Sequence, residues 1–309
     1  MILFFYGENS YGMRREVERL KAHYVQKSDG DLNLELIDMN DKNAGHLLDA
    51  LAVMPLLATS RFIIVRGLGE NKKAVERIDE ILQAVSSSTV LLIEEPKVDK
   101  RSSYFKTLST LKQAKEFKNL SDSQLRDWLV AEAKQLGGNI APGLAMNLIR
   151  RVGNDQWQLE QEVRKLVAYE PNVTQVAIDE LVVANVEQTI FELTDAVIAG
   201  NLERAMSTYK ALARQGVADQ QILAMLVWQY RNITLASDNL GKGDGWAKEF
   251  GISPYAVNNA ARVATKVALS DLKRAYRLIV EADYSIKSGA SESSAALQDL
   301  ILALCRREG

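Results

Sequence analysis

The chain has almost none of the residues from which several common kinds of active site are built. Among its 309 residues there are one cysteine, Cys305, and two histidines, His23 and His46. A single cysteine excludes an internal disulfide framework and is typical of a reducing compartment. Two histidines leave little material for a histidine-rich metal site or a histidine-based catalytic triad. We therefore expect no metal, no cofactor and no catalytic residue.

The chain also lacks a long apolar segment and an excess of charge of one sign. The apolar run at residues 2–6 is too short for the apolar region of a signal peptide or for a membrane span. The 38 basic and 40 acidic residues give a formal net charge of −2, so no chain-wide field attracts nucleic acid or an anionic membrane. We expect a cytoplasmic protein with no membrane partner, whose nucleic-acid contacts are local or shared with other subunits.

What is present, over roughly the first 120 residues, is an alternation of short β-rich runs with helical patterns. Strands are expected at residues 2–6, 34–39, 62–65, 89–93 and 114–117, and helices after residue 6, at 47–53 and at 74–85. Such alternation is typical of an α/β domain with a mainly parallel sheet. We assign this domain to residues 1–120.

From Ser121 onward the β-rich runs stop and helix signals follow one another. Ser121 and Gln124 form a capping box, and Ser253 followed by proline is typical of a helix start. Glycines separate the later helices, most clearly in the loop 241–245, and an apolar face at 297–304 predicts a last amphipathic helix. We expect a small helical domain at 121–185 and a second helical domain at 186–309.

A degenerate phosphate-binding motif follows the first strand. A working P-loop reads G-x-x-x-x-G-K-[ST], in which lysine reaches the β/γ-phosphates and the hydroxyl holds Mg²⁺. Gly7 and Gly12 keep the glycine spacing, but Met13 and Arg14 replace both chemical residues. The loop is either an unusual ATP site or a helix-start loop retained by the fold, and the missing lysine favours the second interpretation.

The acidic residues that end the fourth expected strand, Glu94 and Glu95, stand where an ATPase places its metal-binding aspartate. Two interpretations remain open for them. They are solvated side chains at a strand end, or a residue of an ancestral nucleotide site.

Two adjacent leucines, Leu56 and Leu57, follow Pro55 and the helix expected at 47–53. Proline disfavours a helical conformation at Met54 and fixes its own φ, so the leucines are expected on a turn between helix and strand. Adjacent leucines on a turn do not easily face one core. They either cap the domain core or anchor a partner through a small apolar surface.

Several segments, in order along essentially the whole chain, resemble the bacterial DNA polymerase III delta subunit, a clamp-loader subunit of the AAA+ superfamily. They are Met54-Pro55-Leu56-Leu57-Ala58-Thr59-Ser60-Arg61-Phe62-Ile63-Ile64-Val65, Val98-Asp99-Lys100-Arg101, Gly153-Asn154-Asp155 with Leu159-Glu160, Glu162 and Lys165-Leu166, Ile190-Phe191-Glu192-Leu193-Thr194-Asp195-Ala196, and Ala282-Asp283-Tyr284-Ser285-Ile286-Lys287-Ser288-Gly289.

The resemblance implies an α/β N-terminal AAA+-like (P-loop NTPase-like) domain with a parallel sheet, an all-α lid domain and an all-α C-terminal collar domain. It implies that Leu56 and Leu57, with Met54 and Pro55, bind the beta sliding clamp. The protein would open this ring for loading onto primed DNA without hydrolysing ATP, together with gamma/tau and delta-prime subunits. The chain carries Leu57 where the family often has phenylalanine.

Two alternatives compete with this interpretation. A delta-prime-type loader subunit usually has a zinc-binding cysteine cluster and a Ser-Arg-Cys motif, and this chain has neither. A divergent P-loop enzyme would show tight, Mg²⁺-dependent ATP binding.

Basic clusters are the remaining candidates for contacts with DNA phosphates. They are Lys97, Lys100 and Arg101, Arg150 with Arg151, and Arg306 with Arg307. Because short basic clusters are usually solvated, no DNA-binding residue is assigned.

Overall fold

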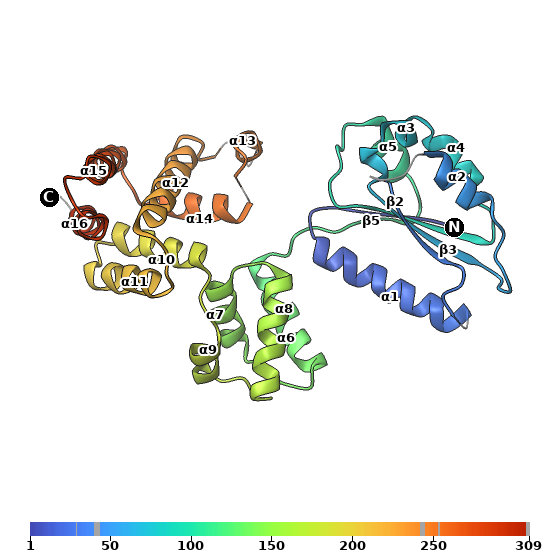
Figure 1. Cartoon of the computed structure of the whole chain (residues 1–309), viewed down its shortest axis with the longest axis horizontal. Helices are drawn as coiled ribbons and strands as arrows, with labels where there is room; N and C mark the ends of the chain where they lie inside the picture. Colours follow the sequence, from blue (N-terminus) through green and yellow to red (C-terminus); the bar gives the residue numbers. More distant parts are fainter. Residues whose placement is uncertain (29, 40–43, 242–244, 253, 307–309) are drawn as a thin grey trace. The chain divides into compact units, whose positions relative to one another are not determined.

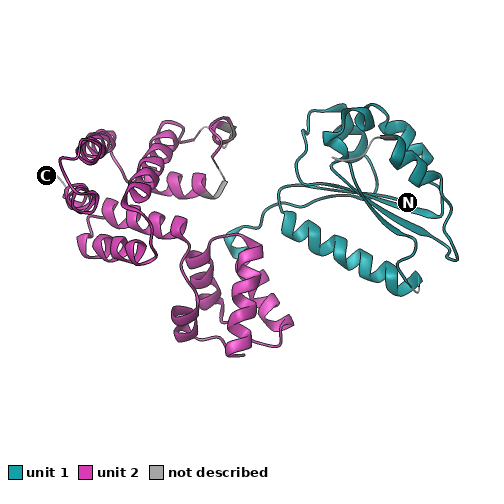
Figure 2. Ribbon diagram, viewed as in Figure 1, with its two compact units in different colours: residues 1–123 teal, residues 124–309 magenta. Residues whose placement is uncertain are grey.

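The computed structural model of the protein describes residues 1–28, 30–39, 44–241, 245–252 and 254–306. The chain divides into two compact units, Met1–Ser123 and Gln124–Gly309 (Figure 2). The further division of the helical part at residue 185 stays a prediction, as do the three domain bounds. Most of the loop 241–245, the helix-cap residue Ser253 and the basic residue Arg307 lie outside the described residues.

Unit 1 is built on a parallel sheet, as the sequence predicts. In the described part of this unit the strand order is β2-β3-β4-β1-β5, and every pair of neighbours is parallel. The strands are β1 (Ile2–Tyr6), β2 (Leu34–Asp38), β3 (Arg61–Arg66), β4 (Thr89–Glu95) and β5 (Ala114–Glu116). The inner strands are nearly continuous buried apolar runs, because helices cover both faces of the sheet.

The helices of unit 1 are distributed unequally over the two faces of the sheet. They are α1 (Ser10–Ser28), α2 (Ala44–Ala52), η1 (Leu68–Glu70), α3 (Lys72–Glu76), α4 (Ile78–Ala84) and α5 (Ser103–Ser109). Helix α1 lies alone on one face, and the others cover the opposite face (Figure 1). The chain runs from β1 to the β2 edge and then reverses direction, so right-handed crossovers place the later helices on the other face.

Two details of unit 1 differ from the sequence prediction. The helix expected at 74–85 is divided into α3 and α4, because the backbone departs from helical geometry at Arg77. Helix α5 was not expected. It begins after Ser102, whose hydroxyl accepts a hydrogen bond from the Phe105 N–H at 3.1 Å, and at seven residues it is too short to show a clear apolar period.

Every named element in the described part of unit 2 is a helix. Its helices are α6 (Asp122–Gln135), α7 (Pro142–Val152), α8 (Gln156–Tyr169), α9 (Gln175–Leu181), α10 (Val186–Ile198), α11 (Leu202–Arg214), α12 (Asp219–Asp238), α13 (Gly245–Glu249), α14 (Pro254–Ala264), α15 (Leu269–Lys287) and α16 (Ser293–Cys305). Helix α7 was missed, although Pro142 at its first position is a helix-start signal. None of the described helices is long and apolar enough to cross a bilayer.

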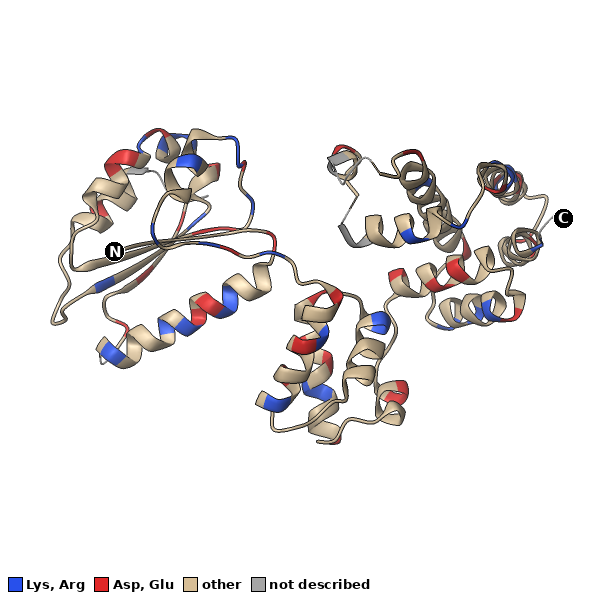
Figure 3. Ribbon diagram, turned by 180° about the vertical axis from the view of Figure 1, so that it is seen from behind, with Lys and Arg blue, Asp and Glu red and all other residues tan. Residues whose placement is uncertain are grey.

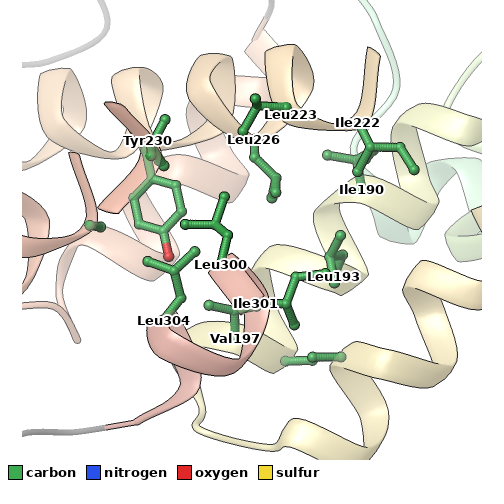
Figure 4. Close-up of a cluster of buried hydrophobic side chains, with 14 of the residues drawn as sticks. Ile190, Leu193, Val197, Ile222, Leu223, Leu226, Tyr230, Leu300, Ile301 and Leu304 are labelled. Carbon is green, nitrogen blue, oxygen red and sulfur yellow. The ribbon is translucent and has the colours of Figure 1, made fainter. Parts of the chain in front are cut away.

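The largest core of unit 2 lies where α10, α12 and α16 meet. Figure 4 shows Leu193 of α10, Leu226 of α12 and Ile301 of α16 pointing toward one another, with Tyr230 at the edge of the cluster. The predicted last helix is confirmed, since its apolar face is buried in this core.

Candidate functional site

The carboxyl ends of β1 and β4 are the first place to look for a site. These strands are neighbours, and Tyr6 at the end of β1 is in register with Glu95 at the end of β4. Their outgoing connections pass to opposite faces of the sheet, which makes this the topological switch point where open α/β sheets bind ligands. The degenerate P-loop lies at this point.

Most of the degenerate P-loop is helix. The side chain of Asn9 caps α1 by accepting a hydrogen bond from the Gly12 N–H at 2.7 Å, and α1 begins at Ser10. Gly12, Met13 and Arg14 therefore belong to the first turns of α1. This cap leaves only residues 7–9 between strand and helix.

The short loop 7–9 is closed by the segment that follows β5. The Gly7 N–H donates to the Glu95 carbonyl at 3.2 Å, and the Asn9 N–H donates to the Phe117 carbonyl at 3.0 Å. The Asn9 amide also donates to the Lys118 carbonyl at 3.2 Å. A phosphate cradle needs backbone N–H groups directed at the ligand, and here those of Gly7, Asn9 and Gly12 donate to the protein itself.

Gly7 is required by this closure. Its φ is 125°, and a Cβ atom at this position would lie 2.3 Å from the Phe117 carbonyl oxygen. The glycine that resembles the start of a P-loop therefore serves the close approach of two backbone segments.

The two residues that replace the P-loop chemistry have structural environments of their own. Met13 is fully buried in the core between α1 and the sheet. Arg14 is partly exposed and forms an ion pair with Glu18 at 3.0 Å. Basic and acidic residues alternate along α1 (Figure 3).

The acidic end of β4 is occupied by protein partners. Glu94 forms an ion pair with Arg66 at 2.7 Å. Glu95 is 1% exposed and accepts hydrogen bonds from the Gly69 N–H at 2.6 Å and the Tyr104 hydroxyl at 2.8 Å. Burial raises the pKa of Glu95 above its ordinary value. Neither carboxylate is the solvated side chain of the first interpretation.

The second candidate region is the turn between α2 and β3, residues 53–60, which we call the anchor turn. Helix α2 ends at Ala52, before Pro55. The side chains of Met54, Leu56 and Leu57 are 84%, 61% and 95% exposed. Both leucines therefore project from the surface instead of capping the core.

The backbone of the anchor turn is strained at its most exposed residue. Leu57 has φ 56°, and among the described residues it is the only non-glycine with a positive φ. The left-handed region is unfavourable for a leucine and persists only where the surroundings impose it. Residues in such sparsely populated backbone conformations cluster at functional sites.

Three side chains outside the exposed part of the turn hold it against the sheet. The Asn33 amide forms two hydrogen bonds with the backbone of Leu56, and the Tyr24 hydroxyl donates to the Ser60 carbonyl at 2.7 Å. Arg61, which also pairs with Glu35, donates to the Val53 carbonyl at 3.4 Å. Sequence reasoning missed these contributions, because no local pattern links residue 24 or 33 to a turn more than twenty residues away.

Several of the candidate DNA contacts have partners within the protein. Lys100 pairs with Glu116 at 2.6 Å and Arg101 with Asp99 at 3.3 Å. Arg151 joins α7 to the end of α9 through the Val182 carbonyl at 2.7 Å and the Asp179 carboxylate at 2.6 Å. Lys97, Arg150 and Arg306 are exposed. In the described ranges no three His, Cys, Asp or Glu side chains are grouped as a metal site would need.

A parallel sheet covered on both faces, with a closed loop at the P-loop position, defines the class: an AAA+-like domain of the P-loop NTPase type, followed by helical structure. Family models agree and sharpen this. The model "DNA polymerase III, delta subunit" matches residues 3–118, and a second model, for the C-terminal domain of the same subunit, matches residues 187–304. The chain belongs to the DNA polymerase III delta subunit family.

Individual relatives span most of the chain or nearly all of it. DNA polymerase III subunit delta of Bacillus subtilis is 24% identical over 98% of this chain and 92% of its own length. A probable delta subunit of Aquifex aeolicus is 22% identical over 73% of this chain and 67% of its own length. The solved structure of the Bacillus subtilis DNA clamp loader delta protein superposes with a TM-score of 0.75 at 23% identity, covering 99% of this chain and 95% of that one.

Proposed function

We propose that this delta-family protein binds a sliding clamp through Leu56 and Leu57, flanked by Met54 and Pro55, and opens the clamp ring for loading onto primed DNA. The observation that carries the proposal is the anchor turn, where a rigid, strained backbone leaves adjacent leucines in water. An apolar pair on a fixed turn is the form expected of a hot spot that fills a pocket on a partner.

The protein opens the ring by binding energy alone. A ligand shifts a closed/open equilibrium only by its differential affinity for the two states, so this subunit binds open clamp more tightly than closed clamp. No bond is made or broken at its own site. Its role is that of an accessory subunit of the DNA polymerase holoenzyme.

We further propose that the subunit does not hydrolyse ATP. The N–H groups of Gly7 and Asn9 are used within the protein. Met13 stands in the core where the motif places lysine, and Glu95 accepts hydrogen bonds from Gly69 and Tyr104. Gamma/tau subunits supply the ATP-driven motion. They and a delta-prime subunit assemble with residues 186–309, which act as the collar domain, and residues 121–185 form the lid domain. Primed DNA is contacted through the complex.

The test is binding of the full-length protein to the sliding clamp of its own organism, comparing wild type with Leu56→Ala/Leu57→Ala. We expect the double variant to lose at least about a hundredfold in affinity while keeping its circular dichroism and thermal unfolding. Leu269→Ala/Val280→Ala is the matched control, because it trims exposed apolar side chains on α15 and should leave clamp binding unchanged. Failure of the wild type to bind the clamp would overturn the proposal.

Ring opening and the absence of ATP chemistry need separate measurements. Excess protein should release closed clamps from circular DNA without nucleotide, and the double variant should not. Calorimetric titration with ATP and Mg²⁺ should give no tight binding to the isolated protein. Tight Mg²⁺-dependent binding would contradict the non-hydrolysing role and favour the divergent enzyme.

A further inference from the structure

The side-chain amide of Asn33 forms a matched pair of hydrogen bonds with a single residue of the anchor turn. Its Nδ2 donates to the Leu56 carbonyl at 2.8 Å, and its Oδ1 accepts from the Leu56 N–H at 2.7 Å. The Asn33 side chain is buried. Both backbone polar groups of Leu56 are thereby satisfied by one amide, which fixes the position and the orientation of this residue together.

Asn33 directly precedes strand β2 and is bonded to the neighbouring strand β3. Its carbonyl accepts a hydrogen bond from the Phe62 N–H at 2.9 Å. This bond continues the β2–β3 hydrogen bonding to the residue before β2. The Tyr24 hydroxyl fixes Ser60 nearby, at the other end of the turn. The amide of Asn33 is therefore presented from a strand end, and a site supported by sheet residues is held more accurately than one supported by a loop.

The turn needs such a hold because its own side chains do not stabilise it. Leu57 follows Leu56 directly and has the unfavourable φ of 56°, while its side chain is almost fully exposed and contributes little packing. Without the bonds to Leu56, the backbone of the turn would be free to relax toward ordinary φ values, and the two leucines would be held in this conformation less often.

We propose that Asn33 is a positioning residue for clamp binding, which holds the anchor turn in the strained conformation that displays Leu56 and Leu57. The inference rests on the proposed function of the two leucines. The apparent dissociation constant equals the intrinsic one divided by the fraction of molecules in the competent conformation, so losing the hold weakens binding without removing any contact with the clamp.

The test compares Asn33→Ala with Asn71→Ala in the full-length protein. Asn71 is a matched control in the same unit, because its amide also joins two segments, donating to the Met39 carbonyl and accepting from the Ala74 N–H, each at 3.1 Å. We expect Asn33→Ala to weaken binding to the organism's own clamp about tenfold, since two neutral hydrogen bonds are lost. Asn71→Ala should leave clamp affinity unchanged, even if it lowers the thermal unfolding temperature as much as Asn33→Ala does.

Two further readouts separate positioning from general stability. Hydrogen exchange of the free protein should accelerate at the amides of residues 56–58 in Asn33→Ala and not in Asn71→Ala. In a thermodynamic cycle, Asn33→Ala should weaken clamp binding less in the Leu57→Gly background than in the wild type, because glycine adopts φ 56° without strain and the turn then depends less on the hold of Asn33. A purely structural role of Asn33 gives additive effects.

The outcomes distinguish this inference from the proposed function. Tight wild-type binding with unchanged affinity in a folded Asn33→Ala variant overturns the role of Asn33 and leaves the clamp proposal standing. Absence of wild-type binding overturns the clamp proposal. The exchange measurement needs no clamp, and unchanged protection at residues 56–58 then overturns the hold of Asn33 on the turn.

Discussion

The loop at residues 7–9 and the anchor turn at 53–60 are both short connections beside the same sheet, yet they use their chemical groups in opposite ways. The loop directs its N–H groups inward, to the carbonyls of Glu95 and Phe117. The turn fixes its backbone from outside through Asn33 and leaves apolar side chains in water. The loop stands at the P-loop position and is closed by protein groups, whereas the turn leaves its apolar side chains open to a partner.

This contrast shows how a nucleotide-type fold serves a binding role. Backbone N–H groups are the part of a P-loop that the fold itself supplies, and they stop being available once another segment packs over them. Exposed leucines remain available. They contribute favourable free energy only when a partner removes them from water.

Met13→Lys should damage the fold instead of restoring a nucleotide site. The lysine of a working P-loop would here enter a core in which Met13 has no exposed surface, leaving a buried charge without a partner. We expect a loss of about 4 kcal/mol in the free energy of unfolding. Arg14→Lys, at a partly exposed position, is the control and should change it by less than about 0.5 kcal/mol. A stable Met13→Lys protein that binds ATP with Mg²⁺ would show that the loop is open after all.

Gly7→Ala should test the close approach of Phe117 to the loop. A methyl group there would overlap the Phe117 carbonyl, and the positive φ is unfavourable for alanine. Denaturant unfolding should show a loss of about 3 kcal/mol. Gly143→Ala in α7 is the matched control, because its Cβ meets nothing within 4 Å, and it should be neutral or slightly stabilising. Equal effects of the two changes would mean that Phe117 does not close the loop.

The parts of this comparison that the sequence predicts are those with a local cause. The buried strands follow from their apolar runs, and the position of Leu56 and Leu57 after a helix end follows from Pro55, whose fixed φ and missing N–H stop α2. The loss of the P-loop lysine is read directly at Met13.

The parts that the sequence does not predict depend on residues far apart in the chain. Gly7 resembles a ligand-binding glycine until Phe117, more than a hundred residues later, is seen to pack on it. Asn33 and Leu56 show no pattern that would link them. The partners of Glu95, the Gly69 N–H and Tyr104, lie on either side of it in sequence, and no local pattern chooses between the two interpretations of this carboxylate that the sequence leaves open.

Leu57→Gly should change stability and clamp binding in opposite directions. Glycine adopts φ 56° without strain, and Leu57 gives up little buried surface, so the free energy of unfolding should rise by about 1 kcal/mol. Clamp affinity should fall about tenfold, as expected for trimming one anchor side chain. Leu57→Ala is the control, with a similar loss of affinity and no gain in stability. A Leu57→Gly variant that is less stable than the wild type would mean that the turn is not strained.

The smallest effect concerns the pH dependence of stability at the closed end of the sheet. Burial raises the pKa of Glu95, so the folded state holds this proton more tightly than the unfolded state, and the resulting stabilisation is present below the ordinary carboxyl pKa and is lost as pH rises through the folded value. As pH rises from below the ordinary carboxyl pKa, the difference in unfolding free energy between Glu95→Gln and wild type should therefore shift in favour of the variant.

Glu16 on α1 provides the opposite sign for comparison. Its hydrogen bond from Arg19, together with Lys115, lowers its pKa to about 2, so its contribution is present above the ordinary carboxyl pKa and is lost as pH falls toward about 2. Glu16→Gln should reduce the dependence of the unfolding free energy on pH in the acid range. Glu95→Gln should reduce it in the neutral range. If Glu95→Gln left the neutral side unchanged, the Glu95 carboxylate would be open to water, and the strand end that we describe as closed would be accessible to a cation.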